Sequence, residues 1–114
     1  MTKIKSIPLL IGILLCMSML VGCKSEEGFY NKISEINHYA ENADWEQTKK
    51  GVKRLKNMSE NKKWTLQLLG DEAEYEGINI ALEILKESAD AKDKTQVKVE
   101  LGTIRGRLID IYSF

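Results

Sequence analysis

Cysteine, proline and histidine are scarce in this chain of 114 residues, and each shortage excludes a class of structure. The two cysteines are Cys16 and Cys23, so the chain after Cys23 has no thiol for a disulfide or a zinc–thiolate site. Pro8 is the only proline, so no proline interrupts a helix in the rest of the chain. The packing of side chains must therefore supply the stability of the fold.

Catalytic motifs are missing as well. The sequence has no HExxH motif, no glycine-rich phosphate loop and no nucleophile elbow. His38 is the only histidine, and without a nucleophile nearby in sequence we expect it to be structural and partly exposed. The 17 basic and 17 acidic residues lack the concentrated basic excess of a nucleic-acid binder. We expect no enzyme, no nucleic-acid partner and no cofactor.

The N-terminus has the parts of a bacterial export signal. Lys3 and Lys5 form its positive region, and residues 6–22 carry no charge. The signal ends in a lipobox, in which an aliphatic, a β-branched and a very small residue precede a cysteine: Leu20, Val21, Gly22 and Cys23. In bacterial lipoproteins that thiol is acylated, and a peptidase cuts just before it. Two or three acyl chains hold a protein stably at a bilayer. The sequence therefore predicts a lipid-anchored protein on the extracytoplasmic face of the cell membrane.

Two other interpretations of this segment stay open. Residues 6–23 are 18 uncharged residues, and a helix of that length reaches roughly 27 Å, close to the minimum for an uncleaved membrane anchor. Cys23 could also follow an ordinary signal peptide by chance. Under each of the three interpretations, the domain is exported. Cys16 lies within the apolar segment and receives no role.

After processing, the chain has the size of one small domain. We expect a signal peptide over residues 1–22, a lipidated tether over 23–27 and a single domain over 28–114. Removing Lys3 and Lys5 leaves 15 basic against 17 acidic residues, a formal charge of minus two.

The apolar residues of this domain repeat with the period of a helix. Three segments each show one apolar stripe: Phe29, Ile33, Ile36, Ala40 and Ala43; Ile78, Ala81 or Leu82, Leu85 and Ala89; Val97, Leu101, Ile104, Leu108 and Ile111. The segment from Asp44 to about Leu69 is less regular. Its inward candidates are Trp45, Thr48, Val52, Leu55, Met58, Leu66 and Leu69.

Polar residues separate these segments. Asp44 is a plausible N-cap, Gly70 with Asp71 ends one helix and begins another, and Asp93 or Thr95 can cap the last. Short connections favour antiparallel neighbours, so the predicted fold is all-α, a small up-down bundle of four helices. The local alternation in "INIAL" and "VKVEL" leaves a strand as the minor alternative.

Charge differs between the second and third segments. The second is basic and the third acidic, so we expect the two helices to lie side by side with opposite charges. An alternative role for the basic run is contact with anionic lipid headgroups, which requires free lysines.

Several of these residues occur together in a known pattern. Trp45 in "ADWEQTKKGVKRL", then Trp64, then "LLGDEAEYEGINIALEILKESADAKDKTQVKVELGTIRGRLIDI" resembles a family of small uncharacterised exported helical proteins of spore-forming and related Gram-positive bacteria. The resemblance covers most of the mature chain and implies the fold and the location. In that family the turn before the third segment often carries a histidine. Residues 69–72 have none, which puts a metal or proton-relay role there in doubt.

The remaining candidates concern binding. Large aromatic side chains on helices usually belong to the core, but Trp64 lies off the simplest apolar stripe and is the candidate for contact with a partner. The acidic stretch "GDEAEYE" lacks calcium-loop spacing and is expected to be a solvated helix start. Gly102 and Gly106 are four apart, and we expect them to allow close packing within the bundle.

Together these features favour a non-catalytic binding or accessory module for another cell-envelope protein. A small-ligand or metal-sensing bundle is the first alternative, and an enzyme is the second.

Overall fold

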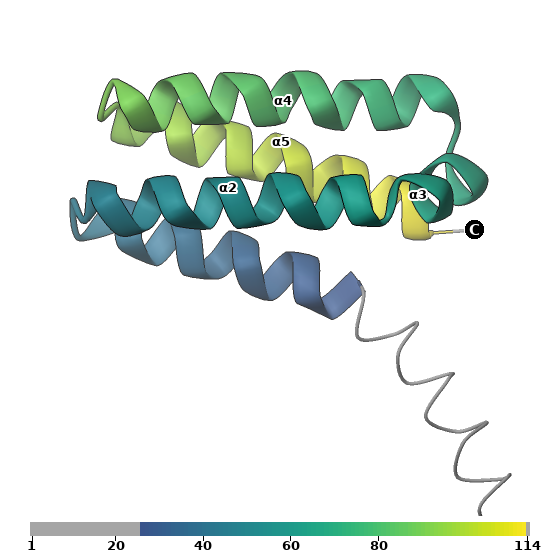
Figure 1. Cartoon of the computed structure of the whole chain (residues 1–114), viewed down its shortest axis with the longest axis horizontal. Coiled ribbons are helices and arrows are strands. Elements are labelled where there is room, and N and C mark those ends of the chain that lie inside the picture. The colour runs from purple at the N-terminus through teal and green to yellow at the C-terminus, as the bar shows by residue number, and fades with distance from the viewer. Residues whose placement is uncertain (1–25, 114) are drawn as a thin grey trace, which may run out of the picture.

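The computed structural model describes residues 26–113, which form five helices and no strand (Figure 1). The first helix covers residues 26–41, and the others are α2 (Trp45–Asn61), α3 (Lys63–Leu69), α4 (Glu72–Asp90) and α5 (Lys94–Tyr112). The all-α prediction is confirmed. The strand alternative is wrong, since "INIAL" lies within α4 and "VKVEL" within α5.

The prediction of four helices is wrong because the second segment divides at Lys62. The buried stripe of α2 runs through Thr48, Val52, Leu55 and Ser59, and the same spacing next reaches position 62. A lysine is rarely buried without a partner, so the stripe cannot continue there. The chain turns at Lys62, and α3 then points Leu66 into the core.

The four long helices form a ring in which each runs opposite to its neighbours (Figure 1). The first helix meets α2 where Ile36 lies against Gly51, and α2 packs on α4, which packs on α5. Lys98 of α5 pairs with Glu41, and the guanidinium of Arg105 lies 5.8 Å from the centre of the Tyr30 ring. These two contacts place α5 beside the first helix and close the ring.

The predicted apolar stripes form the core. All predicted inward residues of α4 and α5 are buried, and so are the first four of the first helix. Ala43 is the exception, because the first helix has already ended and Ala43 lies exposed in the turn with φ 54°. Trp45 packs against the core and is partly buried, as predicted.

Three aspartates begin the helices that follow turns. The carboxylates of Asp44, Asp71 and Asp93 accept hydrogen bonds from the backbone N–H groups of Gln47, Glu74 and Gln96. Such N-caps satisfy backbone donors that have no partner within the helix. The predicted caps at Asp44 and Asp71 are confirmed, and the last helix uses Asp93.

The prediction for Gly102 and Gly106 is wrong. A Cβ atom built at either position would meet nothing within 4 Å, so both glycines lie on the open side of α5. The close approach occurs elsewhere: a Cβ at Gly51 would lie 2.6 Å from Ile36 Cγ1. Gly51, which is buried in α2, therefore allows the first helix and α2 to approach closely.

Within residues 26–113, none of the helices combines the length and apolar character needed to cross a membrane.

Candidate functional site

The predicted lipid-attachment residues lie outside the described part of the chain. These are Leu20, Val21, Gly22 and Cys23, all before residue 26. Their predicted roles stay predictions.

Trp64 is exposed on α3, and Leu68 lies beside it. The two side chains are 82% and 84% exposed, whereas Leu66 between them is fully buried. Residues four apart share one face of a helix, so Trp64 and Leu68 form a single apolar surface opposite Leu66. We call this pair the α3 face. Sequence reasoning found Trp64 and missed Leu68, although the spacing of four could have indicated it.

The α3 face lies at one particular end of the bundle. The start of the first helix, the end of α2 and the end of α5 lie at that end in Figure 1. Two close contacts locate the same end. Cβ atoms at Gly28 and Gly70 would lie 3.7 Å from Met58 Cε and 2.9 Å from Ile111 Cγ1, respectively. The first described residue, Glu26, therefore lies at the end of the bundle that carries α3.

The start of the first helix is held to the bundle at this end. The Tyr30 hydroxyl donates a hydrogen bond of 2.9 Å to Glu26, and Arg105 of α5 lies over the Tyr30 ring. Partial burial and the hydrogen bond to Glu26 raise the pKa of the Tyr30 phenol to about 12. The phenol is therefore neutral at physiological pH and able to donate this bond.

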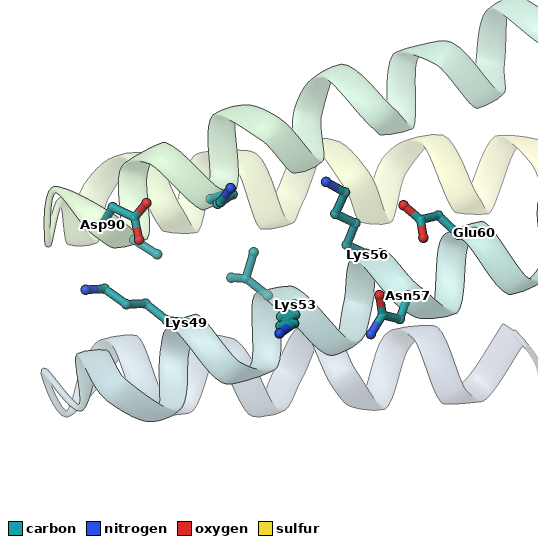
Figure 2. A pocket seen from close by; sticks show the side chains of 9 residues that line it. Lys49, Lys53, Lys56, Asn57, Glu60 and Asp90 are labelled. Carbon is teal, nitrogen blue, oxygen red and sulfur yellow. The ribbon is translucent and has the colours of Figure 1, made fainter.

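A second surface feature is a groove between α2 and α4, shown in Figure 2. It encloses about 420 Å³. Its α2 wall consists of Lys49, Val52, Lys53, Lys56, Asn57 and Glu60, and its α4 wall of Lys86, Ala89 and Asp90. Val52 and Ala89 are buried and form the floor. We call this feature the lysine groove.

Charge pairing between α2 and α4 is sparse. The helices lie side by side as predicted, yet Lys56 and Glu83, 2.9 Å apart, form the one ion pair between them among the described residues. Their hydrogen bond raises the pKa of Lys56 and lowers the pKa of Glu83. In the same part of the chain, Lys49, Lys53 and Lys86 have no carboxylate within 4.0 Å. Most of the positive charge in the groove is therefore free.

The polar candidates do not assemble into a site. His38 is exposed, and its Nε2 lies 3.3 Å from the side-chain nitrogen of Asn42. Asp71 caps α4, and Glu74 faces Arg107 at 3.7 Å. Residues 26–113 contain no group of three or more His, Cys, Asp or Glu side chains placed to hold a metal ion.

Comparison with known proteins identifies a family. No curated protein and no solved structure matches the chain. One family model, described as a domain of unknown function (DUF4363), matches residues 22–113, which include every described helix. This match confirms the resemblance to an uncharacterised family. The chain belongs to the DUF4363 family.

Proposed function

We propose that this chain is a lipoprotein anchored through Cys23 on the outer face of the cell membrane. In this proposal it acts as a non-catalytic binding module that contacts another envelope protein through the α3 face. The observation that carries the proposal is the exposure of Trp64 and Leu68 together on one short helix.

Burial of this exposed pair by a partner would stabilise a complex. Burying one large apolar side chain contributes about 1.5–3 kcal/mol, and tryptophan is enriched among the residues that dominate protein interfaces. Lys62 and Lys63 precede Trp64 directly, and they could supply part of a polar rim. A small apolar centre with a charged edge suits a protein partner.

The tether favours a partner close to the membrane. Cys23 lies three positions before residue 26, and three extended residues span at most about 11 Å. Because α3 lies at the same end as residue 26, the α3 face would be held near the bilayer (Figure 1). A partner embedded in the membrane, or lying on it, could reach this surface.

The interior of the bundle supports a binding role more than catalysis. Most of the largest fully buried side chains are aliphatic or aromatic, among them Phe29, Ile36, Leu82 and Leu108, and the buried polar residues are Thr48, Ser59, Ser88 and Glu100. Apolar side chains of this kind cannot transfer protons or act as nucleophiles. The surface is therefore the better place to look for function.

Photo-crosslinking in cells tests the proposal. A crosslinking residue at position 64 or 68 should capture one envelope protein, whereas the same residue at exposed Glu87 should not. With that protein purified, W64A/L68A should weaken its binding by about tenfold or more. The control I80A removes another exposed apolar side chain and should leave binding within about twofold.

Two outcomes would overturn the proposal. One is capture of the same proteins from positions 64 and 87. The other is crosslinking to lipid alone from positions 64 and 68, which would make the α3 face a membrane contact.

A further inference from the structure

The lysine groove has a charge opposite to that of the whole domain. Four lysines and two carboxylates line it, while the chain from Cys23 onward has two more acidic than basic residues. Lys49 and Lys53 are one turn apart on the same face of α2, where like charges destabilise a helix by about 0.2–0.5 kcal/mol. An anion in the groove would relieve this repulsion.

We propose that the lysine groove is a binding site for a short phosphodiester chain that lies lengthwise between α2 and α4. Lys49, Lys53 and Lys86 would contact its phosphates. They are exposed at the groove and unpaired within residues 26–113, whereas Lys56 is held by Glu83. This proposal uses a surface separate from the α3 face and does not depend on its role.

The spacing of the lysines sets the repeat of the ligand. On a helix rising about 1.5 Å per residue, Lys49 and Lys53 are about 6 Å apart along the axis. Phosphates joined by a three-carbon spacer can match this interval. Lysine ammonium groups bind phosphate as compact point charges. The floor of Val52 and Ala89, with the apolar stems of the lysines, can accommodate the carbon spacer.

Carboxylates restrict the length of the chain. In Figure 2, Asp90 lies across the groove from Lys49 at one end, and Glu60 lies beyond Lys56 at the other. Lys49 and Glu60 are 11 positions apart on α2, about 16 Å along the helix. Because both carboxylates repel phosphate, the groove should hold about two or three phosphates of this repeat.

Phosphodiesters occur both in soluble polymers and in lipid headgroups, so the experiment needs both sources. The full-length chain, purified in a neutral detergent, would be titrated with glycerol phosphate, with a glycerol-phosphate trimer and with a longer oligomer. In a separate arm it would be mixed with vesicles of phosphatidylglycerol or, for comparison, phosphatidylcholine. Binding should strengthen from the single unit to the trimer and change little beyond it.

Matched lysine variants distinguish the groove from general attraction. K49Q/K53Q/K86Q should weaken trimer binding by about tenfold or more, because it removes the three free groove charges. K50Q/K92Q/K94Q removes the same charge at exposed positions that do not line the groove, and should change binding by less than about twofold. All six lysines are exposed, so both variants should fold normally.

Each outcome then has a meaning. Trimer binding that depends on the groove lysines supports the site with a polymer as its source. Binding only to phosphatidylglycerol vesicles, with the same dependence, supports the site with a lipid headgroup as its source. Equal losses in the two triple variants, or binding in neither arm, would overturn the proposal. None of these readouts involves Trp64 or Leu68, so failure here leaves the proposed partner contact untouched.

Discussion

Gly51 and Gly102 are both helical glycines, yet they meet opposite surroundings. A Cβ at Gly51 would lie 2.6 Å from Ile36 Cγ1, and Ile36 is fully buried, so the neighbour has little room to move. A Cβ at Gly102 would meet open space. Glycine is a poorer helix former than alanine by about 1 kcal/mol. At Gly51 the steric cost of a Cβ opposes this gain in helix propensity, whereas at Gly102 nothing opposes it.

Alanine substitutions should therefore have opposite effects at these two positions. G51A should lower the free energy of unfolding by about 1 kcal/mol, because overpacking of about 1–3 kcal/mol exceeds the gain in helix propensity. G102A should raise it by about 0.5–1 kcal/mol. Urea denaturation followed by circular dichroism measures both. An equal stabilisation by the two variants would contradict the close packing of α2 on the first helix.

At the scale of elements, α3 packs one side chain into the core and exposes two large apolar side chains to solvent. Leu66 is its one buried residue, while Trp64 and Leu68 face outward. Seven residues form too short a helix to be stable alone in water, so α3 depends on its contacts with the rest of the bundle. Leu66 is therefore the main anchor of the α3 face, and Leu69 is a second, partly buried contact with the core.

Removing that anchor should release α3. L66A should destabilise the chain by about 2–5 kcal/mol and speed cleavage by trypsin after Lys62 and Lys63. L68A removes a side chain of the same size from the solvent side and should change stability by less than about 0.5 kcal/mol. Urea denaturation and timed proteolysis provide the two readouts. A cost for L68A as large as that for L66A would mean that the outward orientation of Leu68 is wrong.

Sequence predicted the long helices better than it predicted the surface. Apolar periodicity identified the stripes of α4 and α5 because burial on one face is a local pattern. Periodicity missed the break at Lys62. The apolar stripe of the second segment is irregular, so it did not reveal that its next inward position is occupied by a lysine. Sequence reasoning assigned close packing to Gly102 because spacing alone cannot tell a packed face from an open one. The lysine groove depends on which side of α2 meets α4, and only the folded chain determines that.

At the scale of the whole molecule, the two candidate surfaces have different positions. The α3 face lies at the end where the first helix begins (Figure 1), whereas the lysine groove runs along the side of the bundle, from Lys49 and Asp90 near the opposite turns to Glu60 near the end of α2. From Lys49 to Glu60 the groove covers about 16 Å of α2. With a tether at Cys23, the α3 face would face the membrane and the groove would lie along the side of the domain.

That orientation depends on the attachment of Cys23, and one measurement tests it most directly. Cells expressing the wild-type chain or C23A would be labelled with a traceable fatty acid and separated into membrane and soluble fractions. We expect labelled wild-type protein in the membrane fraction, and unlabelled C23A lost from it, because the acyl chains provide the attachment. C23A that stays in the membrane through an uncleaved apolar segment, or wild-type protein without label, would contradict lipid attachment at Cys23.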